Sequence, residues 1–230
     1  MGEKRTIRSD SKVLVLCEGV DEKFFFMWFL DYYKKKGVRS YNLIQIEDIG
    51  GINDVQTQMA LWKNTHGFEQ IKVIGVIRDA EKNAIGAESS VRKALRDNGF
   101  SVPSEAFEIC KEESRIPSVY AILPGFRDEN KKLVNGALED LCLAILKDDQ
   151  ADVSIESVND FLAEYGKEFH KDYPRIHKNK LHTYFSADDR FVDLKIGEAA
   201  KVGAFNFEAV EMQKYKDMFD TMISSVDDTL

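Results

Sequence analysis

Acidic side chains stand at the ends of three apolar runs of the chain, and their types suit metal chemistry. In chain order these acids are Glu18, Glu47, Asp48, Asp79 and Glu81. Carboxylates that lie close together repel one another and resist ionisation unless a cation neutralises them. Mg²⁺ and Mn²⁺ prefer hard oxygen ligands, and Mg²⁺ is typically held by one or two carboxylates together with a substrate phosphate. The acids therefore predict a divalent-metal site, whereas the alternative is that each acid is a solvated strand end.

The elements that must position these acids are predicted strands of a parallel sheet. Val13–Cys17 is a continuous apolar run of strand length, which is typical of a strand buried on both faces. Further strands are predicted at residues 41–46, 71–77, 106–110 and 118–123. Strands that alternate with helices predict an α/β fold with a doubly wound, mostly parallel sheet. Ligands of such sheets bind beyond the carboxyl ends of the strands, so the acids are expected to converge at one rim.

Helical patterns separate the predicted strands and dominate the last third of the chain. A helix over residues 21–33 is apolar nearly all round, and another is predicted over residues 84–98. After residue 147 the strand signals stop, and the last predicted helix covers residues 207–223. The chain is therefore divided into a polar N-terminal segment, an α/β core and a helical C-terminal extension packed on the core. Their bounds are 1–11, 12–147 and 148–230.

Two acidic motifs of this sequence resemble the two motifs of the TOPRIM domain. Residues 13–22 form a hydrophobic strand followed by Glu-Gly and an acidic helix start, which is similar to the first motif. Residues 74–81 look like the second motif, a strand that ends in Asp-x-Asp. Here Glu81 replaces the second aspartate, which keeps the charge and lengthens the side chain.

The resemblance extends over about residues 12–146 and includes two further segments. Residues 121–125 and 136–141 are similar to parts of a small stand-alone TOPRIM-like family related to the OLD (overcoming lysogenization defect) nucleases. This resemblance implies a TOPRIM, Rossmann-like fold and Mg²⁺-dependent or Mn²⁺-dependent phosphodiester chemistry.

The resemblance also implies roles for individual acids. Catalytic roles fall to Glu18, Asp79 and Glu81, with Glu18 as a general acid and base or as a metal ligand. The implied metal ligands are Glu18, Glu22, Asp79, Glu81, Glu139 and Asp140. The alternatives are that Glu22 only interacts favourably with the positive N-terminal end of its helix, and that Glu139 and Asp140 only form the exposed face of the helix that they begin. Two bound ions would support hydrolysis, and one ion with Glu18 as proton carrier would suit nicking or strand transfer.

A basic stretch with interleaved aromatic residues lies in the last third of the chain. The predicted nucleic-acid contacts there are Lys171, Arg175, Lys178, Lys180 and His182. A phosphate backbone requires positive charge, and basic residues mixed with aromatic residues suit a nucleic-acid contact. The alternative is a solvated loop with an aromatic anchor. The histidines of this stretch do not follow the spacing of a zinc site.

The composition narrows the possible classes of protein. The 230 residues include 32 Lys and Arg against 40 Asp and Glu, a net charge of −8, which argues against a generic basic nucleic-acid coat. The sequence contains no P-loop, no Gly-x-Gly-x-x-Gly and no Gly-x-Ser-x-Gly motif. The three cysteines lack zinc spacing and suit a reduced, cytoplasmic protein. No apolar run is long enough to span a membrane, so no membrane partner is expected.

Two functions therefore remain open. The first is a metal-dependent nuclease of TOPRIM/OLD type that cuts DNA or RNA. The second is a non-catalytic or partner-dependent module that binds a nucleic acid or a nucleotide. Its partner would be an ATPase or another protein, because full-length OLD proteins carry an ATPase domain and no P-loop occurs here. A third and weaker option, primase-like nucleotidyl transfer, needs nucleotide-binding elements that the sequence does not show.

Overall fold

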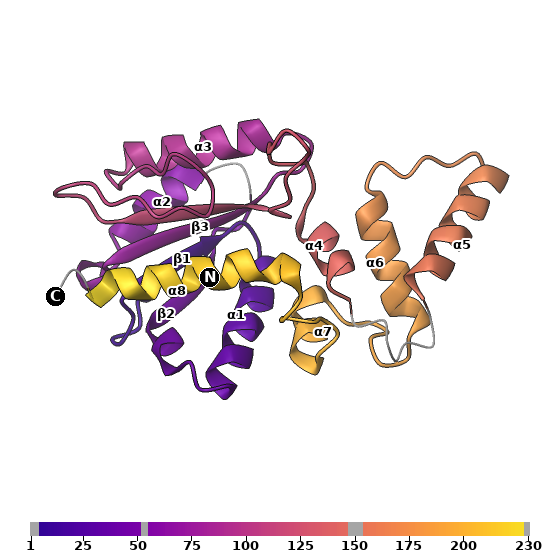
Figure 1. The fold of residues 1–230 in the computed structure, drawn as a ribbon, viewed down its shortest axis with the longest axis horizontal. Coiled ribbons are helices and arrows are strands. Elements are labelled where there is room, and N and C mark those ends of the chain that lie inside the picture. The colour runs from indigo at the N-terminus through magenta and orange to yellow at the C-terminus, as the bar shows by residue number, and fades with distance from the viewer. Residues whose placement is uncertain (1–4, 52–54, 147–153, 228–230) are drawn as a thin grey trace.

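A four-stranded, all-parallel sheet lies at the centre of the computed structural model, which describes residues 5–51, 55–146 and 154–227 (Figure 1). Its strand order is β2-β1-β3-β4. In chain order the strands are β1 (Val13–Cys17), β2 (Ile44–Asp48), β3 (Val73–Asp79) and β4 (Ser118–Leu123). The α/β class and the parallel sheet predicted from the sequence are confirmed.

The order of the strands creates a switch point between β1 and β3. From β1 the chain passes through α1 (Val20–Lys35) to the edge strand β2, then through α2 (Val55–Lys63) to β3 on the other side of β1. From β3 it passes through α3 (Ala84–Asp97) to β4. The connections that leave β1 and β3 therefore run in opposite directions, and the ends of two such strands are where doubly wound sheets bind ligands.

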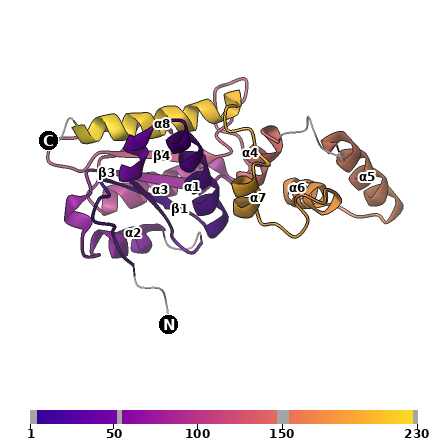
Figure 2. The same cartoon turned by 90° about the horizontal axis from the view of Figure 1, so that it is seen from below.

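Each face of the sheet is covered by its own apolar core. Leu14 and Leu16 of β1 belong to the cluster that includes residues of α2 and α3, whereas Val13 and Val15 belong to the cluster that includes residues of α1. The final helix α8 (Val210–Asp227) lies on the same face as α1, and Figure 2 shows α8 and α2 on opposite sides of the sheet.

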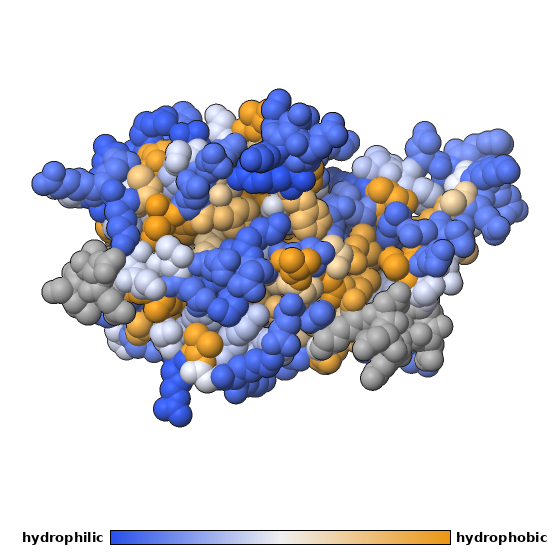
Figure 3. Space-filling model, viewed as in Figure 1, coloured by the Kyte–Doolittle hydropathy of each residue, from blue (hydrophilic) through white to orange (hydrophobic). Residues whose placement is uncertain are grey.

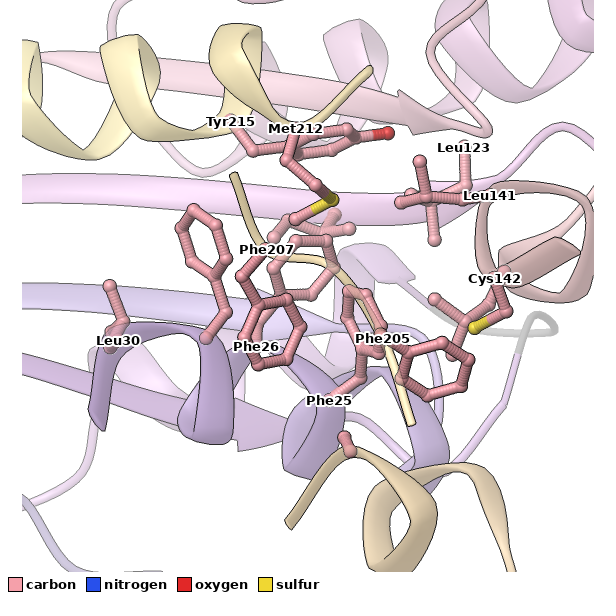
Figure 4. Close-up of a cluster of buried hydrophobic side chains, with 14 of the residues drawn as sticks. Phe25, Phe26, Leu30, Leu123, Leu141, Cys142, Phe205, Phe207, Met212 and Tyr215 are labelled. Atoms are coloured by element: carbon pink, nitrogen blue, oxygen red, sulfur yellow. The ribbon is translucent and has the colours of Figure 1, made fainter. Parts of the chain in front are cut away.

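The last helix fills the centre of one core rather than its margin. Tyr215, Phe219 and Met222 are fully buried, and a Cβ on Gly75 of β3 would lie 2.8 Å from Cε of Met222. Figure 4 shows Tyr215 and Met212 above the aromatic residues of α1. The glycine in β3 thus allows α8 to approach the sheet closely.

The other helices lie at the end of the sheet to which the strands point. They are α4 (Leu138–Ala144), α5 (Ile155–Glu168), α6 (Ile176–Ala187) and α7 (Ile196–Val202). Figure 1 shows α5 and α6 projecting beyond the α/β body, with α4 between this pair and the sheet. The space-filling view shows mostly hydrophilic residues on the visible face of the projecting pair (Figure 3).

Several predicted elements differ from the structure. The second strand begins at Ile44, because residues Arg39–Leu43 form a 3₁₀ turn. The strand predicted over residues 106–110 is wrong: Cys110 forms only an isolated bridge with Ser118. The last helix begins at Val210, after Phe207 has turned into the core.

Two further predictions have different outcomes. The domain boundary predicted between residues 147 and 148 lies outside the described residues, so the division of the chain stays a prediction. Within the described residues no helix has the length and apolar character needed to cross a bilayer.

We expect Phe219→Ala to destabilise the protein by about 3–5 kcal/mol, because it would leave a cavity among buried rings. Phe219 lies 6.1 Å from Phe26 and 5.9 Å from Phe29 between ring centroids. Urea unfolding would measure the change in the free energy of unfolding. The control is Phe161→Ala on α5, where the side chain is 54% exposed and a change below about 1 kcal/mol is expected. Equal small effects would mean that α8 is not part of the core.

Candidate functional site

The register of the two central strands places Glu18 beside Arg78. Cys17 is paired with Ile77, and the N–H of Glu18 continues the ladder by donating to the carbonyl of Ile77 at 3.1 Å. Nε of Arg78 lies 3.5 Å from Oε2 of Glu18, and the two side chains are only 10% and 11% exposed. This is a buried ion pair in which Oε2 of Glu18 and both Nε and Nη1 of Arg78 have no hydrogen-bond partner among the described residues.

The surroundings of Glu18 bring the pKa of its carboxyl group close to physiological pH. Burial raises its pKa to about 7; the Arg78 guanidinium and the N–H of Asp79 oppose this effect, whereas the Glu22 carboxylate adds to it. A carboxyl group with a pKa near the working pH can both take up and release a proton. The geometry therefore suits the acid and base role that sequence similarity implies for Glu18.

Asp79 is the most constrained acid of the site. It ends β3, is 6% exposed, and its Oδ1 accepts a hydrogen bond of 3.0 Å from the N–H of Leu138. Burial raises its pKa to about 9, and four neighbouring carboxylates add to the shift. In order of effect they are Glu22, Glu18, Glu139 and Glu81. Four of the other five predicted metal ligands thus act on Asp79 through their charges, and the assignment of these acids as metal ligands stays a prediction.

Glu22 reaches this group from the first turn of α1. It is 8% exposed, and burial raises its pKa while the backbone N–H groups of Glu22 and Gly19 hold the shift back. A Cβ on Gly19 would lie 2.8 Å from Oε2 of Glu22. The glycine therefore leaves room for the carboxylate, which both meets the start of its helix and faces Asp79.

Glu81 is tied to the segment that leads into α4. Its N–H donates to the carbonyl of Gly136 at 2.7 Å, and the N–H of Gly136 donates back at 2.9 Å. Glu81 has a φ of 49°, a left-handed conformation that is uncommon for a residue other than glycine. Gly136 has a φ of 146°, and a Cβ there would lie 2.7 Å from Oδ2 of Asp140. This double contact fixes the start of α4 beside the end of β3.

The two acids of α4 have different surroundings. Glu139 is 6% exposed, and its Oε1 lies 3.2 Å from Nζ of Lys178 on α6. Asp140 instead accepts a hydrogen bond of 2.8 Å from the N–H of Ala137 and lies 3.8 Å from Nδ1 of His177. Asp140 therefore caps its own helix, and its assignment as a metal ligand stays a prediction.

Three residues of the predicted basic strip lie on the helix α6, and only part of the strip faces the acids. Lys178 and His182 lie four residues apart on α6 and line a pocket of about 310 Å³. Burial lowers the pKa of Lys178, but Glu139 outweighs it, so the pKa is raised. Lys180 is two residues from Lys178 and so faces away from it along the helix.

The two other basic residues of the strip, Lys171 and Arg175, precede the first residue of α6, Ile176. Nζ of Lys171 lies 5.4 Å from the centroid of the Tyr165 ring, and Arg175 is an exposed residue at the start of α6. Their predicted contact with nucleic acid stays a prediction.

The acids at the end of β2, Glu47 and Asp48, form ion pairs with Lys23 of α1. Nζ of Lys23 lies 2.6 Å from Oε2 of Glu47 and 3.7 Å from Oδ2 of Asp48. Lys23 thus pairs with both acids of the edge strand and offsets one of their two negative charges.

The donor chemistry of the group fits a hard cation. All its acids offer oxygen, and Oε2 of Glu18 is buried without a hydrogen-bond partner among the described residues. Within those residues, however, no three His, Cys, Asp or Glu side chains are arranged to hold a metal ion together. Protein cations occupy part of the group instead, with Arg78 at Glu18 and Lys178 at Glu139.

One family of proteins matches nearly the whole chain. The match covers residues 12–224, and the family is described as "Protein of unknown function (DUF3226)". The chain belongs to this family. No curated protein and no solved structure matches the chain. Because the DUF3226 match runs from β1 into α8, it includes the sheet, the acids at its rim and the basic helix α6.

Reasoning from the sequence missed Arg78 and the partner of Glu139. Arg78 directly precedes Asp79 at the end of an apolar run, and a lone arginine in that position is a signal that a buried acid lies beside it. The contact between Lys178 and Glu139 joins residues 39 positions apart, and no local pattern connects them.

The metal-free protein should lose stability between pH 4 and pH 9 because of Asp79. Its pKa in the folded protein is about 9, above the ordinary value of 3.8. The folded protein therefore binds this proton more tightly than the unfolded chain does. The resulting contribution to the free energy of unfolding is fully present below pH 3.8 and is lost as the pH rises towards 9. In Asp79→Asn that loss disappears, a difference of at most about 1.4 kcal/mol per pH unit. Urea unfolding in EDTA across this range measures it.

The control for this experiment is Asp160→Asn on the exposed side of α5. Its stability should follow that of the wild type at every pH. Parallel curves for the wild type and Asp79→Asn would contradict the raised pKa.

Proposed function

We propose that the chain is a Mg²⁺-dependent or Mn²⁺-dependent nuclease with a TOPRIM-like core, which cleaves phosphodiester bonds of DNA or RNA. The observation that carries this proposal is the buried carboxylate group at the switch point between β1 and β3. Burial, together with the charges of four neighbouring acids, raises the pKa of Asp79 in this group to about 9. A divalent cation would stabilise the ionised form of such a group, and clefts with strongly perturbed acids are candidate functional sites.

The residues divide into those that would hold metal and those that would act on the substrate. Asp79, Glu22 and Glu81 would hold the ion, with Glu139 as a further ligand. When bound, the ion would supply a polarised phosphate and a more acidic water molecule. Glu18, with a pKa of about 7, would take up or release the proton.

Two protein cations support the same chemistry. Arg78 and Lys178 lie within 3.5 Å and 3.2 Å of carboxylates of the group. When a substrate phosphate approaches, these donors would stabilise the negative charge that develops on its oxygens. Lys178 and His182 border the pocket on α6, which supports a contact between this helix and the substrate backbone.

The TOPRIM assignment and the compartment are parts of this proposal. The parallel sheet with acids after β1 and after β3 supports a TOPRIM-like arrangement, with Glu81 in place of an aspartate. The free cysteines Cys17 and Cys142 are buried thiols, which supports a reducing compartment such as the cytoplasm.

A second function is favoured by a specific observation. The described residues form no group of three metal ligands, and Arg78 and Lys178 already balance two of the acids. Such a group suits a nucleic-acid-binding or nucleotide-binding module that is inactive alone. It would then act with a protein partner such as an ATPase.

A cleavage assay distinguishes the two functions. Supercoiled plasmid, single-stranded DNA and structured RNA would be incubated with the protein in Mg²⁺, in Mn²⁺ and in EDTA. We expect metal-dependent cutting by the wild type and a loss of at least about 100-fold in Asp79→Asn and Glu18→Gln, because each substitution removes an ionisable group from the site.

Glu47→Gln is the matched control, because Glu47 is paired with Lys23 at the edge strand, and it should cut like the wild type. Cutting that survives in Asp79→Asn and Glu18→Gln would remove the assignment of the site. No cutting in the wild type, together with a stable partner on purification, would favour the binding module.

A further inference from the structure

A second basic surface lies on the outer face of α3, away from the basic residues of α6. A pocket of about 430 Å³ opens there; besides the charged side chains Glu88, Lys93 and Asp97 it is bordered by Ile85, Ser89, Arg92 and Arg96. These four residues follow one another at intervals of four, three and four, so they form one ridge along the exposed side of the helix. The opposite side of α3 is buried against the sheet.

The arginines of this ridge are not used inside the protein. Neither Arg92 nor Arg96 forms an ion pair within residues 5–51, 55–146 and 154–227. Nε of Arg92 is buried and has no hydrogen-bond partner among these residues. The guanidinium charges of Arg92 and Arg96 are therefore not offset by an internal carboxylate of the described residues, which leaves them available to an anionic group at the pocket.

The acids that flank the ridge already have partners. Oε1 of Glu88 accepts a hydrogen bond of 2.7 Å from the hydroxyl of Tyr120, and Oδ2 of Asp97 lies 2.6 Å from Nζ of Lys93. The ridge itself contains two arginines and no acid. Three cations and two acids border the pocket, so this surface carries a small positive charge on a chain with a net charge of −8.

The ridge starts at the acid group and leads away from it. Ala84, the first residue of α3, lies three positions after Glu81, and Asn83 caps the helix by accepting the N–H of Gly86 at 2.9 Å. At about 1.5 Å per residue, Arg92 and Arg96 lie about 12 and 18 Å along the helix from Ala84. Figure 1 shows α3 and α6 as separate elements on different sides of the strand ends.

We propose that Arg92 and Arg96 bind the phosphate groups of a nucleic-acid strand that runs from the acid group along α3. Ile85, which is 71% exposed, offers apolar surface to a base or sugar at the end nearest the acids. This inference rests on the proposed function, because the strand held by α3 is the strand that reaches the carboxylates. It assigns to α3 the positioning of the substrate and not its cleavage.

The test measures the binding of fluorescein-labelled oligonucleotides to the full chain in EDTA, by fluorescence anisotropy between 50 and about 200 mM salt. The probes are single-stranded DNA, RNA of the same sequence and duplex DNA. We expect Arg92→Gln/Arg96→Gln to lower the affinity for the preferred probe at least about tenfold at low salt, and two lost contacts should reduce the slope of log K against log salt by about 1.4 for a single strand.

The control removes the same charge from another surface. Lys34→Gln/Lys35→Gln acts on the last turn of α1, where both lysines pair with Asp31, and it should change neither affinity nor slope. Unchanged binding in the α3 variant, an equal loss in both variants, or no binding of any probe by the wild type would overturn the inference.

These outcomes are separate from those of the proposed function. A wild type that binds through α3 but cuts nothing in Mg²⁺ or Mn²⁺ would keep this inference and remove the nuclease. A wild type that cuts, with the same oligonucleotide affinity in the α3 variant, would keep the nuclease and remove this inference.

Discussion

Repulsion among buried carboxylates is the constraint on which the architecture of the strand ends depends. Asp79 is only 6% exposed and is acted on by the charges of four other acids, so its ionised form is strongly disfavoured unless a cation neutralises it. The protein supplies partial compensation from four separate segments. Arg78 faces Glu18, Lys178 faces Glu139, the N–H of Leu138 donates to Asp79, and the N-terminal turn of α1 meets Glu22. The negative charge that these contacts do not offset is the charge that a bound cation would neutralise.

This compensation joins parts of the chain that the sequence presents as separate. The double hydrogen bond between Glu81 and Gly136 holds α4 against the end of β3, and Lys178 then connects α4 to α6. Further along, α8 fills the core beneath the sheet, and its closest approach requires Gly75. The site is therefore complete only when the helices after residue 154 are folded onto the sheet, which agrees with a family match that spans both.

Reasoning from the sequence located the ends of β1 and β3, because a buried strand followed by an acid is a local pattern. Glu18 and Asp79 were therefore placed correctly at one rim. The pairing of Arg78 with Glu18 depends on the register between two strands, which no local pattern specifies. The contact of Lys178 with Glu139 likewise depends on tertiary packing, and α6 itself was hidden because basic and aromatic residues resemble an exposed loop. Local signals thus identified the acids, and the cations that balance them became visible only in three dimensions.

Net charge sets a further condition on any nucleic-acid function of this molecule. A chain with a charge of −8 and a buried acid group repels a phosphate backbone at the place where chemistry would occur. Metal ions would reverse the sign of the charge only locally, within the reach of the carboxylates. Attraction over a longer distance would come from basic surfaces such as the outer ridge of α3, which leads away from the acids, and the side of α6 that carries Lys178 beside Glu139. In the proposed nuclease, binding and chemistry would therefore use separate parts of this fold, because a basic helix would hold the strand while the acids and their cation would act on one phosphate.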